Sequence, residues 1–334
     1  SMFKRFLKNN KIQGYRVDQL YDQYFKQLIT SWDELTTWPK DLRERLKAEV
    51  PFSKLENFQE FESLDGRTVK TLAYTTEGFP VESVLMRSKD RITVCISCMS
   101  GCPVGCKFCA TGRMGLNKSL SDKEIIDQVM YFERKLKTSG EKITNIVYMG
   151  MGEPMLNLES VVESIQILKD SKALGMSARR ITVSTAGYIS QLGEFLKKDL
   201  GVNIAISLHA PNQRLREKLM PTVAKNNPLD ELIALLVKDQ KKRNKKITYE
   251  YIMIKDVNDS PEHAKELAKL LKNQIALVNL INFNKVDGIA YEPSTRKRII
   301  DFQYVLDERG TNNTLRYSYG SDIKGACGQL ASIA

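Results

Sequence analysis

The sequence of 334 residues contains no apolar run that approaches the ~20 residues a membrane-spanning helix needs, and no signal-peptide stretch follows its start. Internal repeats and low-complexity segments are also missing. Apolar residues make up 42% of the chain and charged residues 27%, a balance that excludes a disordered chain and a fibre. These features predict a globular cytoplasmic protein without membrane association, built as one large domain with a smaller attachment or as two domains.

Acidic residues are fewer than basic ones: the chain has 40 Asp and Glu and 51 Lys and Arg, which gives a net charge of +11. Such an excess points to a polyanionic partner such as a nucleic acid, although solvated lysine faces produce the same excess. Charge alone therefore leaves the partner open. The basic residues cluster at 4–5, 179–180, 241–246 and 296–298, of which 241–246 also fits a solvated helix end.

Five of the six cysteines fall within residues 95–109, whereas a disulfide framework is typical of short secreted chains. The spacing Cys102-x3-Cys106-x2-Cys109 places three thiols on one glycine-containing loop. Three such thiolates can hold three irons of a 4Fe–4S cluster and leave the fourth iron open to a small molecule. With an aromatic residue before the last cysteine, this spacing is typical of radical S-adenosylmethionine (SAM) enzymes. Two alternatives stay open: a zinc site, and a four-cysteine ferredoxin-type cluster that uses Cys95 or Cys98.

Strand and helix patterns alternate along the chain after residue 92. Apolar, β-branched runs predict buried parallel strands, and a capping box at Ser121 and Glu124 predicts the start of a helix between two of them. Six such units predict an α/β fold, an incomplete parallel (β/α)6 barrel that binds ligands at the carboxyl ends of its strands. The predicted strands are 92–97, 143–149, 180–185, 202–208, 247–254 and 276–283, followed by a seventh at 314–319.

The chain before the barrel is expected to form two smaller parts. Apolar residues at helical spacing predict short amphipathic helices up to about residue 50, and residues 67–94 alternate as short strands do. We therefore expect a helical accessory domain at 1–60, a strand-rich linker at 61–91, and the partial barrel with the Cys327 loop at 92–334.

Residues suited to ligand binding follow several predicted strands. Gly152 lets the backbone approach a ligand and Glu153 can accept from an amino group, although a plain strand-to-helix turn explains a lone Gly-x-Gly equally well. His209, one of two histidines, is by itself more often a hydrogen-bonded structural residue. The other residues at strand ends are Ser184, Ser207, Leu208 and Asn284.

Four segments carry a joint pattern: GCPVGCKFCATG at 101–112, MGMGEP at 149–154, SLHAPN at 207–212 and ACGQL at 326–330. Together they resemble the RlmN-type adenine methyltransferases, radical SAM enzymes that methylate carbon 2 of an adenosine in 23S rRNA and in some cases act on tRNA. The resemblance spans nearly the whole chain.

A sister group, the Cfr-type enzymes, methylates carbon 8 of the same rRNA adenosine. Pro154 and Ala210 favour the RlmN side of this resemblance. Lys324-Gly325 departs from it, because the family usually has an acidic residue and alanine at these positions.

The resemblance implies a role for each candidate residue. Cys327 would carry a methyl group, Cys95 would resolve the adduct through a transient disulfide, and Glu82 would act as general base. Two SAM molecules would be used per turnover, with a reductant such as flavodoxin or ferredoxin, and residues 1–60 would contact RNA. No dimerisation signal is found, so a monomer is expected. By the same resemblance, one cluster is held by Cys102, Cys106 and Cys109, and SAM is contacted by Gly152, Glu153, Ser184, Ser207, Leu208, His209 and Asn284.

Simpler explanations exist for these residues. A free cysteine such as Cys327 or Cys95 is most often a small buried hydrophobe, and an isolated Glu on a strand, such as Glu82, is usually exposed. Cys98 is interpreted as structural. The competing functions are a Cfr-type carbon-8 methyltransferase, a radical SAM activase or synthase with another substrate, and a non-enzymatic iron–sulfur module that binds RNA or transfers electrons.

Overall fold

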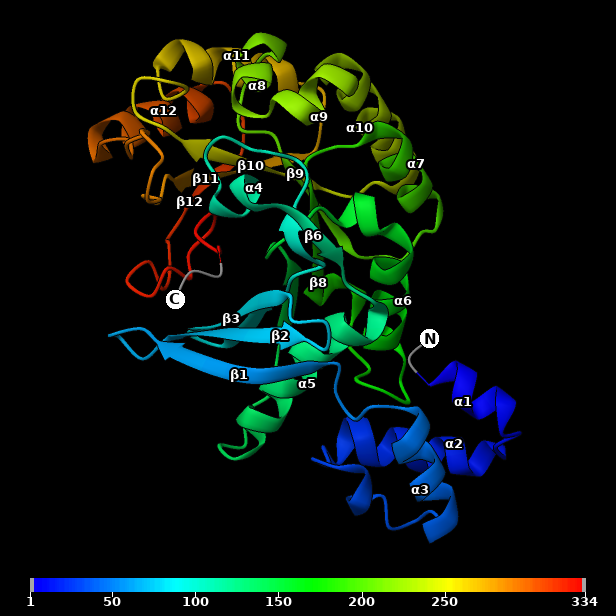
Figure 1. The fold of residues 1–334 in the computed structure, drawn as a ribbon. Helices are drawn as coiled ribbons and strands as arrows, with labels where there is room; N and C mark the ends of the chain where they lie inside the picture. Colours follow the sequence, from blue (N-terminus) through cyan, green and yellow to red (C-terminus); the bar gives the residue numbers. More distant parts are fainter. Residues whose placement is uncertain (1–2, 332–334) are drawn as a thin grey trace.

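The computed structural model describes residues 3–331, and its central element is a curled sheet (Figure 1). Every neighbouring pair from β4 to β12 is parallel, whereas β1 to β4 pair antiparallel. The predicted incomplete parallel barrel, including its seventh strand, is therefore confirmed. The strand order in the sheet is β1 (Leu55–Glu62), β2 (Thr68–Thr75), β3 (Pro80–Ser88), β4 (Arg91–Cys95), β7 (Asn145–Tyr148), β8 (Ile181–Thr185), β9 (Asn203–Ser207), β10 (Ile247–Met253), β11 (Ala276–Asn282) and β12 (Asn313–Arg316).

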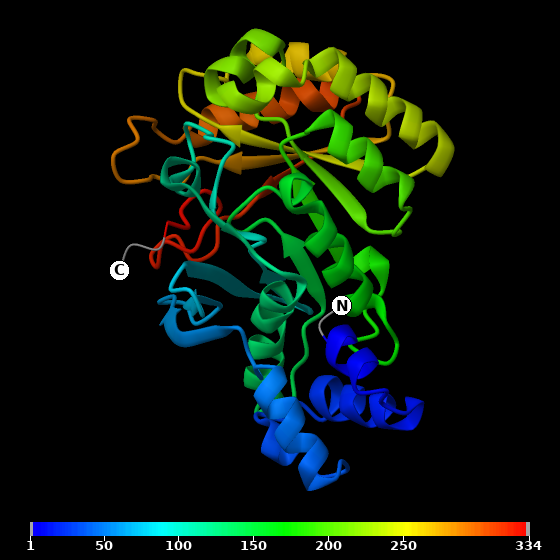
Figure 2. The same ribbon diagram turned by 45° about the vertical axis from the view of Figure 1, so that its right-hand side comes forward.

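Helices cover the outer face of the parallel strands (Figures 1 and 2). The predicted capping box is present: the Ser121 side chain accepts from the backbone N–H of Glu124, and the Glu124 carboxylate accepts from the backbone N–H of Ser121 at 2.7 Å. None of the helices formed by residues 3–331 combines the length and apolar character that crossing a bilayer demands. The covering helices are α5 (Asp122–Lys137), α6 (Leu158–Lys169), α7 (Ile189–Lys197), α8 (Gln213–Leu219), α9 (Pro221–Asn226), α10 (Leu229–Arg243), α11 (Pro261–Leu271) and α12 (Arg296–Glu308), with short 3-10 turns η3 (Pro154–Asn157) and η4 (Ala178–Arg180).

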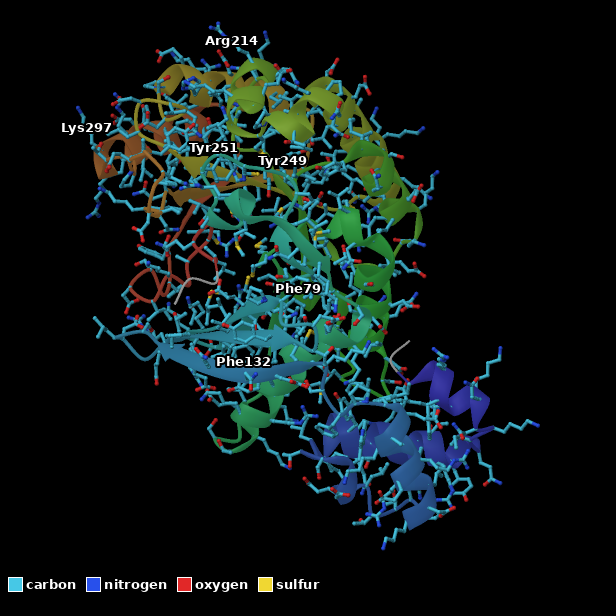
Figure 3. The ribbon with its side chains drawn as sticks, viewed as in Figure 1. Phe79, Phe132, Arg214, Tyr249, Tyr251 and Lys297 are labelled. Atoms are coloured by element: carbon cyan, nitrogen blue, oxygen red, sulfur yellow. The ribbon has the colours of Figure 1, made fainter. Side chains whose placement is uncertain are left out.

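The side chains of β10 alternate between the outer face of the sheet, which packs against helices, and the inner face, which lines the candidate site. Tyr249 and Tyr251 of β10 are fully buried, and the Tyr251 ring lies 5.3 Å from Phe302 of α12 (Figure 3). Because successive side chains of a strand point to opposite faces, Glu250 and Ile252 face the interior of the barrel, where both line a cavity. Figure 3 also shows exposed basic side chains on the outer layer, Arg214 and Lys297 among them.

The N-terminal residues form a small helical unit that packs against α5. Asp127 of α5 is the centre of this contact: it accepts from the Tyr24 hydroxyl at 3.2 Å and from the backbone N–H of Lys54 at 2.8 Å, and it pairs with Lys123 at 2.9 Å. Because each of these buried polar groups has a hydrogen-bond partner, the contact fixes one position of the helical unit on α5. The elements of this unit are α1 (Lys4–Asn9), α2 (Gly14–Tyr21), η1 (Asp22–Lys26), η2 (Trp32–Glu34) and α3 (Lys40–Glu49); residues 1–2 of the expected 1–60 domain lie outside the described residues.

Strand β1 was not predicted, and it crosses the expected boundary at residue 60. The pairing of β1 with β2 shifts between Glu56 and Gln59, and Asn57 there has a φ of +54°. This bulge inserts an extra residue, so Leu55 and Phe58, which both pack against the core, lie three positions apart, a spacing that imitates a helix in the sequence.

Glu133 of α5 makes the stability of the fold depend on pH. Burial raises the pKa of its carboxyl to about 7 from 4.5, although the backbone N–H of Ile143 and the charge of Lys142 oppose the shift. Because this carboxyl binds its proton more tightly in the folded state than in the unfolded state, it stabilises the fold fully below pH 4.5. This stabilisation is lost as pH rises to about 7. Glu133→Gln is therefore expected to raise the free energy of unfolding at pH 8 by about 1–3 kcal/mol and to change it little at pH 4.5. Thermal unfolding at both pH values measures this, with Glu159→Gln on the exposed face of α6 as the control; equal shifts at both values would contradict it.

Candidate active site

The loop with three cysteines leaves β5 (Met99–Cys102) and returns through α4 (Ala110–Met114) to β6 (Gly115–Ser119), which pairs with β5. Gly101 has a φ of +75°, and a Cβ there would lie 2.0 Å from the carbonyl oxygen of Gly115, so the hairpin requires glycine. The backbone N–H of Lys107 donates to the carbonyl of Leu219 at the end of α8, at 3.0 Å. The cysteine loop is therefore fixed on both sides.

Cys102, Cys106 and Cys109 line a cavity of about 920 Å³ inside the barrel. Within residues 3–331, no three His, Cys, Asp or Glu side chains converge as the ligands of a single metal ion would. Thiols that share a cavity without sharing one ion position suit a 4Fe–4S cluster, in which each thiolate binds a different iron. The donor set thus fits a cluster.

The remaining cysteines of the 95–109 segment do not line this cavity. Cys98 is 3% exposed, and its carbonyl oxygen accepts from the backbone N–H of Leu120 at 3.0 Å and from Asn157 Nδ2 at 2.8 Å. Cys95 lines the adjacent cavity. Cys98 is close enough to Cys102 for the charge of that thiolate to raise its pKa, so the four-cysteine alternative stays untested.

Burial raises the pKa of all three loop thiols, to about 12 for Cys102. The backbone N–H groups of Val104 and Gly152 oppose the shift at Cys102 by donating to its sulfur. Without a metal these thiols would stay protonated at neutral pH. Because a bound cation deprotonates a coordinating thiol, cluster assembly is expected to release protons.

Glu153 forms part of the cavity wall opposite the cysteine loop. It is 3% exposed, and its carboxylate accepts from Thr185 Oγ1 at 2.5 Å, from the backbone N–H of Ala186 at 2.7 Å and from that of Met155 at 3.0 Å. Burial raises its pKa, and these donors, with the nearby Arg216, work against that rise. A fixed buried carboxylate is suited to a cationic amino group.

Ser184 and Ser207 line the same cavity with their Oγ atoms 3.3 Å apart. His209 lies beside them, with its ring 4.8 Å from that of Phe108, the aromatic residue of the cysteine loop. Burial lowers the pKa of His209 to about 3, and its Nδ1 accepts from the backbone N–H of Ile252 at 3.1 Å, so the ring is neutral. Gly152 also lines the cavity, whereas Leu208 is fully buried behind it.

The C-terminal loop brings Cys327 to the cavity. Gly328 accepts from the backbone N–H of Ala110 at 2.8 Å, which ties the loop to α4 next to the cysteine loop. Asn284 does not line the 920 Å³ cavity; its Nδ2 donates to the carbonyl of Cys327 at 3.1 Å. Lys324, the departure from the family pattern, pairs with Asp287 at 2.9 Å.

Cys327 and Cys95 both line a second cavity of about 750 Å³ that adjoins the first. Burial and the nearby Cys327 together raise the pKa of Cys95 to about 12. Cys327 is exposed at the cavity mouth, yet surrounding protein raises its pKa, and the Arg316 guanidinium opposes the rise. Arg316 itself is held by Glu250 at 3.4 Å. Sequence reasoning missed both Arg316 and Glu250.

Glu82 of β3 is 1% exposed, contrary to the usual surface location of a lone strand Glu. It lines a third cavity of about 1800 Å³, shared with Asn284 and with Lys324 of the C-terminal loop. Its Oε1 lies 3.0 Å from Lys70 Nζ, and its Oε2 has no hydrogen-bond partner among the described residues. A buried carboxylate oxygen without a hydrogen-bond partner among the described residues can accept a proton.

The chain is similar to proteins of known class over its whole length. Residues 96–276 match the model of the Radical SAM superfamily. A probable dual-specificity RNA methyltransferase RlmN of Dictyoglomus thermophilum is 42% identical over 322 residues, 96% of this chain and 91% of that protein. The dual-specificity RNA methyltransferase RlmN of Alkalilimnicola ehrlichii is 40% identical over 330 residues, 98% of this chain and 90% of that protein. A solved radical SAM methyltransferase from Sphaerobacter thermophilus is 40% identical with a TM-score of 0.95, covering 98% of this chain and 96% of that chain.

Proposed function

The chain belongs to the radical SAM superfamily and, within it, to the RlmN family of RNA methyltransferases, and from this membership we propose that it methylates carbon 2 of an adenosine in 23S rRNA, with tRNA as a second substrate. The observation that carries the proposal is the meeting of Cys327 with the three loop cysteines and Glu153 in one cavity. That arrangement supports a methyl-accepting role for Cys327 beside the proposed site of SAM.

Carbon 2 of adenine is electron-poor and carries no nucleophile, so transfer of a methyl cation to it is unfavourable. When bound, the cluster and SAM supply the one-electron chemistry that converts a methyl group on Cys327 into a carbon radical. We propose that Cys102, Cys106 and Cys109 hold the one cluster, and that Glu153, Ser184, Ser207 and His209 orient SAM.

Cys327 first accepts a methyl group from one SAM, as a thiolate that displaces it by nucleophilic substitution. Arg316 favours this thiolate. A second SAM is consumed in activating the methyl group, after which the methylene carbon joins the ring and RNA is tethered to the Cys327 sulfur.

Release of the product uses the two other candidate residues. Glu82 removes the proton from the ring carbon with its free Oε2. Cys95, as a thiolate, then attacks the Cys327 sulfur and breaks its bond to the methylene carbon, which leaves with the electron pair and takes up a proton to become the methyl group. The disulfide that forms must be reduced before the next turnover. The shared cavity of Cys95 and Cys327 supports this pairing.

The substrate adenosine must leave its base stack, because neither Cys327 nor the cysteine loop can reach carbon 2 inside a helix. The third cavity, of about 1800 Å³, borders Glu82 and the Cys327 loop and is large enough for a nucleotide. We propose the helical unit before residue 50 and the basic side chains of the outer surface as contacts to the RNA backbone.

The proposal is tested by anaerobic reconstitution of iron and sulfide, followed by incubation with SAM, a flavodoxin or dithionite reductant, and unmodified 23S rRNA or tRNA in separate reactions. Mass spectrometry is expected to find 2-methyladenosine together with deoxyadenosine. Formation of 8-methyladenosine would establish the Cfr-type alternative, and RNA binding without deoxyadenosine would establish a non-enzymatic module.

A further inference from the structure

Lys70 of β2 is a buried cation to which the proposed reaction assigns no role. Its side chain is 7% exposed and that of Glu82 is 1% exposed, and Lys70 Nζ lies 3.0 Å from Glu82 Oε1. Lys70 faces Phe61 across the β1–β2 ladder, and its Nζ lies 5.0 Å from the centre of that ring. The ammonium is therefore enclosed between an aromatic face and one oxygen of the carboxylate.

A buried ion pair gives little net stability, because the cost of removing two charges from water about equals their attraction. An apolar pair of the same volume would serve the core at least as well. What distinguishes this pair is its location, since Lys70 and Glu82 both line the third cavity. Lys70 occupies Oε1, while Oε2 is buried and has no hydrogen-bond partner among the described residues.

The other charged groups that line this cavity are engaged elsewhere. Lys324 pairs with Asp287 at 2.9 Å, and Lys285 pairs with Glu292 at 2.7 Å. Arg113 of α4 donates to the carbonyl of Asp287, and Asp322 accepts from the backbone N–H of Leu64. Among the residues that the structure describes, Lys70 is thus the cation paired with Glu82.

We propose that Lys70 is a positioning residue for the base: it binds Oε1 of Glu82, keeps the carboxylate ionised inside the cavity, and leaves Oε2 directed at the ring carbon of the tethered adenosine. The inference rests on the proposed role of Glu82. In that step the proton of the ring carbon moves to Oε2 and the electron pair of the broken C–H bond stays with the ring, which would return the single electron left by the radical addition to the cluster of the proposed function. Glu82 becomes neutral, Lys70 stays an ammonium, and the proton leaves to solvent through the cavity mouth.

The test compares the pH dependence of single-turnover RNA methylation in K70M, K70R and the wild type. Without its cation, a buried carboxylate takes up a proton more readily, so K70M is expected to methylate roughly 10²-fold more slowly at neutral pH. The rate of K70M should recover as pH rises, so the acidic limb of its pH–rate profile should lie at higher pH than that of the wild type. The unreleased protein–RNA adduct should accumulate at neutral pH. K70R keeps the charge and should retain the wild-type limb.

K123M is the matched control, because the Lys123–Asp127 pair is similarly buried, at 3% and 1% exposure, and does not line the third cavity. It should lower thermal stability as K70M does without moving the acidic limb. Infrared spectra of the metal-free proteins give a second measurement: at neutral pH, K70M should show an additional protonated carboxyl band over that of the wild type, to which Glu133 already contributes, and the additional band should be absent from K70M/E82Q.

The outcomes separate this inference from the function on which it rests. A wild-type acidic limb in K70M, or the absence of the carboxyl band, would overturn the role of Lys70. Full activity of E82Q would remove Glu82 as base and Lys70 with it. A wild type that forms no methyladenosine would refute the proposed function, while the infrared band would still decide whether Lys70 keeps Glu82 ionised.

Discussion

Cys327→Ala is expected to abolish RNA methylation, by roughly 10³-fold or more, while iron content and SAM binding stay at wild-type levels. The loss is complete because alanine offers no sulfur to accept the methyl group, and no other thiol on the C-terminal loop can replace it. The cluster should persist because Cys102, Cys106 and Cys109 belong to a separate loop fixed by Gly101 and Leu219. Iron analysis, equilibrium dialysis of SAM and mass spectrometry of the RNA measure the three quantities.

Cys98→Ala is the matched control, since Cys98 is buried behind the site and lines neither cavity that contains Cys327. It should retain methylation and lose about 1 kcal/mol of stability through a small buried void. Loss of iron in the Cys327 variant would identify Cys327 as a fourth cluster ligand. Methylation of RNA by that variant would support a radical SAM enzyme that works without a methyl-carrying cysteine.

Most of the parallel strands could be predicted because they are short, largely buried apolar runs rich in β-branched residues, as in Ile181–Thr185 of β8. Strand β1 could not, because its bulge gives the apolar residues a spacing of three. The short helices α8 and α9 were also not predicted; they are held by packing against the barrel, where Leu219 and Val223 are fully buried, and not by a long periodic pattern.

The candidate site likewise contains residues that could be predicted from the sequence and residues that could not. Cysteines and His209 could be singled out because such residues are rare in this chain and their spacing is specific. Lys70 and Arg316 are two of 51 basic residues, and their importance depends on Glu82 and Glu250, which the fold brings to them from other strands. The direction of a loop side chain is likewise absent from the sequence: Asn284 turns to the carbonyl of Cys327.

Cys95→Ala is expected to form the covalent protein–RNA adduct once per active site and then to stop, which leaves RNA attached to Cys327. The proposed release step breaks the bond between the Cys327 sulfur and the methylene carbon by attack of a second thiol on that sulfur. Cys95 is that thiol in the proposed mechanism, and it shares the 750 Å³ cavity with Cys327. Denaturing electrophoresis should show one RNA-linked protein per active site, and nuclease digestion followed by mass spectrometry should place a nucleotide on the Cys327 peptide.

The raised pKa of Cys95 also predicts how the rate of adduct release depends on pH. Because burial and the nearby Cys327 raise it to about 12, Cys95 is almost entirely a thiol at neutral pH, and its thiolate fraction grows about tenfold per pH unit. Resolution of the wild-type adduct should therefore accelerate with rising pH, whereas the adduct of Cys95→Ala, and of the conservative Cys95→Ser, should persist at every pH. Sustained turnover by Cys95→Ala would show that another group releases the product and that the two thiols share a cavity for a structural reason alone.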